Sequence, residues 1–373
     1  MRWGCLLLLA ITLSACSDAG GTVTQEGFHT HWQAYAKKFI QADGRVVEYS
    51  QGNRTTSEAQ AYALFFALLD NDREHFEHIL RWTEDNLAKG DLSKNLPAWL
   101  WGEGKDKSWK VLDSNPASDA DLWLAYTLIQ AGKLWHEPHF LNIGDAVLEQ
   151  IEMQEIGVLD SVGAVLLPTL KSTLEHDKIW RINLSYMPIQ LLRFFASYMG
   201  HDVWNQTIKS VLYLTKMHHV NGVVPDWIIY DRDQKRTYVR QDAAMSYDAI
   251  RVYLWAGMLS KSDVSQSELI ALLKGITKHF RYGWSLPSKI YLTAKKKNHL
   301  KPLGFSAAIL PLLRAINRSK LYHFQIKRVN LAMRDCLLGK PPLYYDNNLM
   351  LFVDAWLEHV LRFEKAGGVR VSW

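Results

Sequence analysis

The 373-residue chain is rich in hydrophobic residues and carries only a small net charge. Hydrophobic residues make up 48% and charged residues 22%, which provides a large core and excludes an intrinsically disordered chain. The net charge of +5 is spread without a basic arm or a long basic run, so no nucleic-acid partner is expected. The 15 Trp, 16 Tyr and 13 Phe exceed the needs of core packing, and flat rings with a polar edge suit the faces of sugars. The composition therefore points to a globular protein that handles carbohydrate.

Residues 1–16 have the pattern of an export signal. Arg2 supplies a positive charge, and the following apolar run is shorter than the roughly 20 residues that a membrane-spanning helix needs. The segment ends in Leu-Ser-Ala-Cys, which resembles a bacterial lipoprotein cleavage box and predicts a lipid on Cys16. Ordinary cleavage after the neighbouring small residues is the alternative. With a short tether at 17–26, this lipid would hold the protein in the periplasm at the outer membrane, and no other membrane contact is expected.

Twelve segments with helical periodicity follow, and no Pro/Ser-rich linker divides them. Residues 27–373 are therefore expected to form a single domain. No stretch between turn signals keeps up an alternation of polar and apolar residues, so no large sheet is expected. The predicted helices span residues 27–41, 57–70, 73–88, 119–132, 137–153, 186–199, 202–219, 247–259, 264–280, 306–316, 319–335 and 347–363.

The predicted helices are of two alternating kinds. Segments such as 59–69 are apolar on nearly every side and must be surrounded by protein, whereas segments such as 73–82 carry charge on one face. The apolar kind recurs at a spacing of about sixty residues, which is typical of a closed repeat architecture. Six inner and six outer helices make an (α/α)6 barrel, and this all-α fold is our prediction.

Five of the predicted inner helices open on a serine, at positions 57, 118, 185, 246 and 306, and serine is a favoured N-cap. Three of them bring a carboxylate into the first turn, namely Glu58, Asp119 and Asp248. Any one of these acids suits the helix dipole, and Thr55 and Glu58 also fit a capping box. Their recurrence on one buried layer favours glycoside hydrolysis, in which one carboxyl protonates the leaving oxygen and another activates water or attacks the sugar. Burial and the charge of Asp119 must outweigh the dipole to keep Glu58 protonated.

Six strings along residues 30–315 resemble family 8 of the glycoside hydrolases, in particular its periplasmic endoglucanases that accompany bacterial cellulose synthesis. The strings are TTSEAQ (55–60), LPAWLWG (96–102), VLDSNPASDAD (111–121), WRINLSY (180–186), SYDAIR (246–251) and GFSAA (304–308). The resemblance implies an (α/α)6 barrel that cleaves β-1,4-glycosidic bonds with inversion and needs no metal or other cofactor. It also implies a β-glucan polysaccharide as substrate and the cellulose-synthesis machinery as a partner.

The resemblance assigns roles to five polar residues. Glu58 would be the general acid, and Asp248 would be the base that takes a proton from water. Asp119 would hold the distorted sugar at the cleavage point, although it has also been assigned as the nucleophile in this motif. Tyr186 and Arg251 would position the base and the water.

Aromatic residues near the motifs are the candidates for sugar stacking. Trp101, Trp109 and Trp180 are expected in loops that enter the barrel mouth, and packing of those loops is the alternative role for each. Ala59 and Ala120 stand where relatives usually have glycine. Both positions are expected in helices, where alanine is favoured, so no change of backbone is expected.

Two other functions stay open from the sequence. A catalytically silent glucan-binding accessory protein of the envelope is one, and the presence of all three acids weighs against it. The same fold acting on chitosan or mixed-linkage glucan is the other. Cellulose is preferred because the strings match the branch associated with cellulose synthesis.

Overall fold

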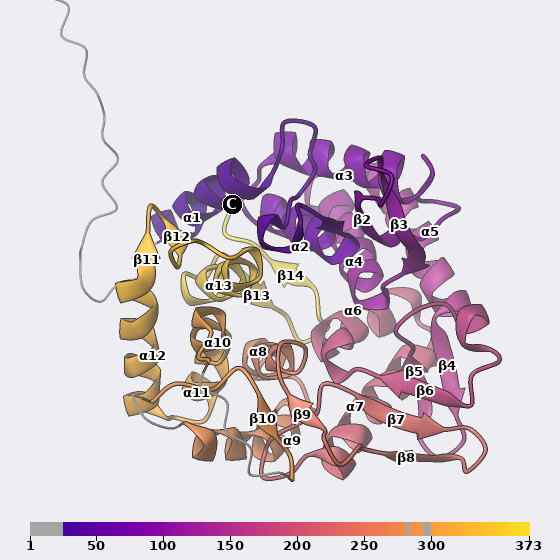
Figure 1. Ribbon diagram of the computed structural model, residues 1–373, viewed down its shortest axis with the longest axis vertical. Helices are drawn as coiled ribbons and strands as arrows, with labels where there is room; N and C mark the ends of the chain where they lie inside the picture. The colour runs from indigo at the N-terminus through magenta and orange to yellow at the C-terminus, as the bar shows by residue number, and fades with distance from the viewer. Residues whose placement is uncertain (1–24, 281–283, 294–299) are drawn as a thin grey trace, which may run out of the picture.

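The computed structural model describes residues 25–280, 284–293 and 300–373, and its helices form a ring of two concentric layers (Figure 1). The predicted (α/α)6 arrangement is confirmed. The inner layer consists of α2 (Ser57–Leu69), α4 (Ser118–Leu134), α6 (Ile189–Met199), α8 (Ile250–Met258), α10 (Leu303–Ala308) and α13 (Tyr344–Leu357). The outer layer consists of α1 (Gln25–Phe39), α3 (Arg73–Leu87), α5 (Pro138–Gln154), α7 (Asp202–His218), α9 (Gln266–Leu273) and α12 (Ser319–Ala332).

Contacts between the inner helices run around the whole ring and close it. Each inner helix contacts the next from α2 through α4, α6, α8 and α10 to α13, and α13 contacts α2 again. Each outer helix packs against an inner one, for example α3 on α2 and α5 on α4. The predicted export signal and Cys16 lie outside the described residues. Within the described ranges, no helix combines the length and the apolar character that a membrane span requires.

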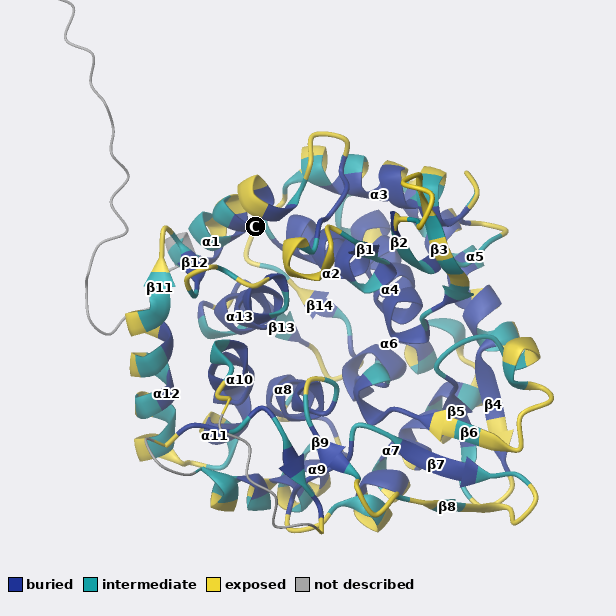
Figure 2. Ribbon diagram, viewed as in Figure 1, coloured by how far each residue is buried: buried dark blue, intermediate teal, exposed yellow. Residues whose placement is uncertain are grey.

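The two layers differ in burial as the sequence predicts (Figure 2). In α4 every residue from Ser118 to Gly132 is buried, whereas α3 buries only one face, which includes Phe76 and Ile79. Ala59 and Ala120 are each 1% exposed in α2 and α4, so the expectation that both are helical is confirmed.

One predicted inner helix, at 306–316, is broken in two. It starts earlier than predicted, as α10, and continues as α11 (Leu310–Ala315) after an interruption at Ile309. Pro311 explains the break, because proline lacks the N–H that a continuous helix needs and its ring collides with the preceding turn. At the start of α11 the same residue is well tolerated.

The expectation that serines cap the inner helices is wrong. Thr56 caps α2, and α6 and α8 begin only at Ile189 and Ile250, several residues after the predicted serines. Ser185 instead lies in a 3-10 turn, η3 (Leu184–Tyr186), where its hydroxyl donates to Asn183 at 2.7 Å. The hydroxyl of Ser185 is thus used in a local hydrogen bond within its own turn, which competes with the role of a helix cap.

Short antiparallel strands connect the helices, and no sheet of the described residues has more than three strands. This confirms that a large sheet is absent from the described part of the chain. The three-stranded sheets are β1 (Thr55–Thr56), β2 (Ala98–Glu103) and β3 (Trp109–Pro116), and β6 (Ile179–Ile182), β7 (Ile228–Asp231) and β8 (Arg236–Tyr238). The pairs are β4 (Ile156–Leu159) with β5 (Gly163–Leu166), β9 (Ala244–Met245) with β10 (Ile290–Tyr291), β11 (Met333–Arg334) with β12 (Leu337–Leu338), and β13 (Arg362–Phe363) with β14 (Val369–Arg370). Short 3-10 turns complete the chain at η1 (Tyr49–Gln51), η2 (Lys171–Leu174) and η4 (Lys274–His279).

Aromatic rings meet between the inner helices. The ring centroid of Phe352 on α13 lies 4.7 Å from that of Phe66, 5.1 Å from those of Tyr62 and Trp123, and 5.0 Å from that of Trp255. These rings come from α2, α4 and α8, and all are buried. Part of the aromatic content that suggested sugar binding therefore fills the core.

Candidate active site

Glu58 lies in the first turn of α2 and is the one residue of that helix that is not fully buried. Thr56 caps the helix by accepting the N–H of Ala59 at 3.2 Å. Glu58 does not complete the capping box that the sequence allowed, because its carboxylate accepts a hydrogen bond from Arg251. Its side chain therefore points to a residue of another inner helix, 193 positions away in the chain.

Arg251, in the first turn of α8, joins the three predicted acids. Its Nη1 donates to Glu58, to the hydroxyl of Tyr62 at 3.0 Å and to Oδ2 of Asp119 at 2.9 Å. Its Nη2 donates to Oδ1 of Asp248 at 3.2 Å. The arginine side chain is 3% exposed, so water screens these ion pairs weakly. Three carboxylates from α2, α4 and the turn before α8 thus meet around one cation.

The charges in this cluster do not balance, and a proton makes up part of the difference. Burial is the main reason that the pKa of Glu58 is raised to about 7; the charges of Asp119 and Asp248 contribute to the rise, and Arg251 opposes it. Glu58 also hydrogen-bonds to Asp119, which requires that one of these two carboxyl groups holds a proton. Burial raises the pKa of Asp119 as well, again against the effect of Arg251. Near neutral pH a carboxyl group of the cluster is therefore still protonated in a substantial share of the molecules.

The three acids differ in their access to water. The side chain of Asp119 is 4% exposed, that of Glu58 is 21% exposed and that of Asp248 is 32% exposed. Asp248 is therefore the carboxylate that water reaches most easily. Asp119 is the most enclosed, and one of its oxygens accepts the N–H of Ala120 at 2.9 Å.

Two tyrosines join the predicted Tyr186 at this cluster. Tyr186, at the end of η3, lies with its ring centroid 5.6 Å from the Arg251 guanidinium. Tyr62 shares that guanidinium, and Tyr345 of α13 donates its hydroxyl to the carbonyl of Tyr247. Burial raises the pKa of Tyr62, Tyr186 and Tyr345 well above the ordinary value, so all three stay neutral.

Sequence reasoning missed Tyr62 and Tyr345. Tyr345 lies beyond residue 315, where the family resemblance fades. A signal was nevertheless present, since a pair of tyrosines opens the last inner helix at the level where other inner helices carry their acids. Tyr62 lies one turn after Glu58, and that spacing places both side chains on the same side of α2.

Trp101 and Trp109 pack against each other and against a cation. They lie in β2 and β3, not in loops as expected, and their rings stack with centroids 5.2 Å apart. The Arg45 guanidinium lies 4.3 Å from the Trp101 ring and 4.7 Å from the Trp109 ring. Trp82 of α3 adds an edge contact to Trp101 at 5.4 Å. Trp101 is thus enclosed by neighbours, while Trp109 is 43% exposed and keeps surface available for a ligand.

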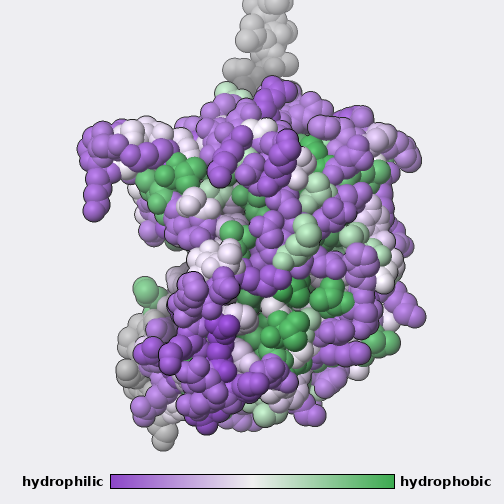
Figure 3. Space-filling model, turned by 90° about the vertical axis from the view of Figure 1, so that its right-hand side faces the viewer, coloured by the Kyte–Doolittle hydropathy of each residue, from purple (hydrophilic) through white to green (hydrophobic). Residues whose placement is uncertain are grey.

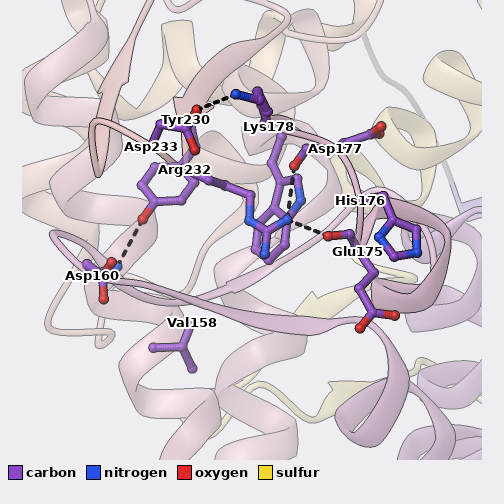
Figure 4. Close-up of a pocket in the computed structure, with 10 residues that line it drawn as sticks. Val158, Asp160, Glu175, His176, Asp177, Lys178, Tyr230, Arg232 and Asp233 are labelled. Carbon is purple, nitrogen blue, oxygen red and sulfur yellow. Dashed lines mark hydrogen bonds and ion pairs between the residues drawn. The ribbon is translucent and has the colours of Figure 1, made fainter.

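Trp180 lies in β6, again a strand rather than a loop, and lines a surface cavity of about 570 Å³ (Figure 4). The Arg232 guanidinium sits 4.7 Å from its ring, and Tyr230 is its neighbour on β7. None of the three predicted acids lines this cavity. Arg181 follows in the strand and therefore projects from the opposite face of the sheet.

The face of β6 that bears Arg181 leads towards the acids. Arg181 lies 4.5 Å from the ring of Trp227, and Trp227 makes an edge contact with Tyr186 at 5.9 Å. Sequence reasoning missed Trp227, although it lies in the connection from α7 to α8, which resembles the connections that contain the three predicted tryptophans. Trp227 lies outside the matched strings, and the selection of aromatic residues near those strings therefore passed over it.

A pair of buried carboxyl groups lies behind the cluster. Asp121 of α4 and Glu155, which follows α5, are both 0% exposed. They hydrogen-bond to each other, and their four oxygens have no other partner within the described ranges. Burial raises the pKa of Glu155 to about 8 and that of Asp121 well above its ordinary value. The pair therefore shares at least one proton at neutral pH.

One face of the ring has a hollow. Figure 3 shows it as a deep notch at the left edge of the outline, which is the side that faces the viewer in Figure 1.

Among residues 25–280, 284–293 and 300–373, no group of three His, Cys, Asp or Glu side chains has an arrangement that could hold a metal ion.

Comparisons with known proteins agree with this architecture. Residues 1–359 match the family model described as glycosyl hydrolases family 8. An endoglucanase from Xanthomonas axonopodis pv. citri is 38% identical over 343 residues, which cover 92% of this chain and 88% of the relative. An endoglucanase from Escherichia coli K12 is 36% identical over 344 residues, which cover 92% and 90%.

A solved structure, an endo-1,4-D-glucanase from Vibrio fischeri ES114, superimposes with a TM-score of 0.79 and 34% sequence identity. The superposition covers 92% of this chain and 99% of that chain. The match of the family model, the identity to curated relatives and the shared barrel lead to one conclusion. The chain belongs to family 8 of the glycosyl hydrolases.

Proposed function

We propose that the chain is an endo-acting glycoside hydrolase that cleaves internal β-1,4-glucosidic bonds of cellulose or a related β-glucan with inversion. The observation that carries this proposal is the grouping of Glu58, Asp119 and Asp248 around the buried Arg251. It supplies a carboxyl group that keeps its proton near neutral pH next to a carboxylate that water can reach. Both are needed to hydrolyse an acetal without a covalent intermediate.

In the proposed reaction Glu58 donates its proton to the glycosidic oxygen as the bond to the anomeric carbon breaks. Asp248 takes a proton from a water molecule, whose oxygen forms the new bond on the opposite face of the sugar. Asp119 and the neutral Tyr186 hold the sugar ring while positive charge develops on it. Arg251 keeps Asp248 oriented through the bond from Nη2. Glu58 ends as a carboxylate and Asp248 as an acid, and water exchanges the proton between turnovers.

The proposed substrate is supported by the names of the relatives, which are endoglucanases, and by the hollow on the face of the ring. The experiment is a panel of soluble carboxymethylcellulose, mixed-linkage glucan, xylan and chitosan, assayed for new reducing ends. Release from carboxymethylcellulose at the highest kcat/KM is the expected result. Release from chitosan alone, or binding without release, would replace the proposal.

We further propose that Cys16 is lipidated and anchors the enzyme in the periplasm at the outer membrane, beside the cellulose-synthesis machinery. The support is the cleavage box at residues 13–16 and the resemblance to the synthesis-associated branch. Labelling of bacteria with an alkyne fatty acid should mark the wild-type chain and not the Cys16→Ser variant. Equal labelling of the two, or none, would contradict the anchor. Co-purification with the synthase from detergent extracts, lost in Cys16→Ser, tests the partner.

A further inference from the structure

The turn that carries Asp248 is held by a carboxylate from another part of the chain. Asp226 lies in the connection from α7 to α8, immediately before Trp227. Its Oδ1 accepts the N–H of Ser246 at 2.7 Å and the N–H of Ala249 at 2.9 Å, and its Oδ2 accepts the Ser246 hydroxyl. Asp248 lies between those two anchor points. Asp226 thus satisfies N–H groups at the start of α8 that a local cap would ordinarily satisfy.

The segment that bears Asp226 is itself fixed to α8. The hydroxyl of Tyr253, on α8, donates to the carbonyl of Gly222 at 2.9 Å and accepts the N–H of Val224 at 3.1 Å. The N–H of Asp226 donates to the carbonyl of Ala244 at 2.8 Å. The segment is therefore bound to α8 through Tyr253 and to the turn before α8 through Asp226. Among the described hydrogen bonds, Asp226 is the only side chain that bonds to both ends of the 246–249 turn.

We infer that Asp226 is a positioning residue that fixes the backbone of the Asp248 turn, so that the Asp248 carboxylate meets the attacking water in the correct place. This inference rests on the proposed function. Arg251 binds the Asp248 side chain through one hydrogen bond of 3.2 Å, so the position of the carboxylate also depends on the backbone that carries it. Displacement of a catalytic group by about 1 Å costs about 10²-fold in rate, so a loose turn lowers kcat even when the sugar still binds.

The test compares kcat and KM of purified full-length variants on carboxymethylcellulose. Asp226→Ala leaves the two N–H groups and the Ser246 hydroxyl without their acceptor, and we expect kcat to fall about 10²-fold while KM changes by less than about threefold. Asp226→Asn keeps an oxygen for both N–H groups, and should retain kcat within about tenfold of the wild type. Ser246→Ala removes only the hydroxyl bond and should lower kcat least.

Asp263 provides a matched control outside the site. Its buried carboxylate accepts the N–H of Ser265 at 2.7 Å at the start of the outer helix α9 and also binds Arg193 at 2.9 Å. Asp263→Ala should lower the melting temperature and leave kcat unchanged. If Asp226→Ala keeps kcat within about threefold, or if Asp263→Ala loses as much kcat, the inference is wrong.

A second substrate distinguishes loss of the base from loss of the acid. An aryl cello-oligosaccharide with a dinitrophenyl leaving group needs no proton from Glu58, so Glu58→Gln should recover most of its rate on it, while Asp226→Ala and Asp248→Asn should not. Recovery of Asp226→Ala would overturn the inference. If the Ala variant melts below the assay temperature, Asp226→Asn combined with Ser246→Ala replaces it. That variant should lose at least about fivefold in kcat, and a smaller loss overturns the inference. Wild-type inactivity on every β-1,4-glucan would instead contradict the proposed function.

Discussion

Arg251 pairs its single positive charge with three carboxyl groups. The excess of negative charge favours a proton on one of these groups. Replacing Arg251 by a neutral residue would leave Glu58, Asp119 and Asp248 to repel one another in a buried place. Tyr62 and Tyr186 remain uncharged beside it because burial raises the pKa of each. The cluster is therefore a set of coupled groups, in which each substitution changes the protonation of the others.

Glu58→Gln should abolish nearly all hydrolysis of carboxymethylcellulose, because glutamine has the same shape and no proton to donate. The expected loss in kcat is about 10²- to 10⁴-fold, which is the usual contribution of a general acid. Reducing-end assays measure it, and circular dichroism with thermal melting verifies that the fold is intact. A variant that is folded and retains wild-type kcat would show that Glu58 is not the acid.

The pKa of Glu58, about 7, predicts the alkaline limb of the pH profile of kcat/KM. Glu58 must be protonated to act, so activity should decline as pH rises through about 7. Asp119→Asn removes a neighbouring charge that raises this pKa, so the limb should move to lower pH in whatever activity remains. Initial rates across pH 4–10, an interval of roughly three units on either side of the pKa, measure both effects. An alkaline limb that does not move in Asp119→Asn would contradict the coupling.

At the scale of single elements, α4 and α5 are joined by the buried pair of Asp121 and Glu155. The pKa of Glu155 in the folded chain is about 8, against 4.5 when it is unfolded and exposed. The folded state therefore holds a proton that the unfolded state releases above about pH 4.5, and the stability contributed by that proton is lost as pH rises towards 8.

We expect the melting temperature of the wild type to fall between pH 5 and pH 8, and Glu155→Gln to flatten this dependence, because a neutral amide can donate to Asp121 at any pH in that window. Differential scanning calorimetry in buffers of matched ionic strength measures it. Glu149→Gln, at an exposed position of α5, is the control and should leave the slope unchanged. An unaltered slope in Glu155→Gln would show that the pair does not carry the dependence.

The helices were largely predictable, because a helix that is apolar on all sides must be surrounded by protein and therefore belongs to the inner layer. The predictions that failed concern residues whose hydrogen-bond or pairing partners lie elsewhere in the sequence. Ser246 does not cap α8, because Asp226, which lies 20 residues earlier in the same connection, accepts its N–H and its hydroxyl. Trp101 and Trp109 lie in the hairpin of β2 and β3, whose pairing is interrupted by register shifts. Trp180 lies in the four-residue strand β6, whose partner β7 comes from a distant segment. Neither arrangement leaves a regular alternation of polar and apolar residues in the sequence.

The site could be predicted to the extent that its residues start inner helices. Glu58, Asp119 and Asp248 lie at or just before the starts of inner helices, and closure of the ring brings these starts together. Arg251 was expected beside them from the resemblance, but its contact with all three could not be read from the sequence, since it depends on the angle between α2, α4 and α8. Trp227 lay in a connection with no periodic signal.

At the scale of the whole molecule, the ring depends on the aromatic contacts between inner helices. Phe352→Ala would leave a cavity among rings from α2, α4 and α8, and we expect a loss of about 3–5 kcal/mol in the free energy of unfolding. Denaturant titration measures the loss. Leu331→Ala, at a position 65% exposed on α12, is the control and should change stability by less than about 0.5 kcal/mol. Similar values for the two would contradict the view that Phe352 joins the inner layer.

The proposed mechanism also predicts the stereochemistry of the product. One displacement by water at the anomeric carbon converts a β-linkage into a new reducing end in the α configuration. Proton NMR in the first minutes of hydrolysis, before mutarotation, should show the α-anomer appearing first. Initial formation of the β-anomer would indicate two displacements, and would make a covalent role for one of the acids necessary.

The C-terminal residues cross the ring at the end away from Glu58. Trp373 donates its indole N–H to the carbonyl of Leu69 at the last turn of α2, and Tyr126 donates to the carbonyl of Gly367 at 2.8 Å. In the described part of the chain these residues cover the barrel at that end, so a polysaccharide would reach Glu58 from the opposite face. The polymer can bind at an internal position and be cleaved there. Both fragments can then dissociate from the face at which the polymer bound.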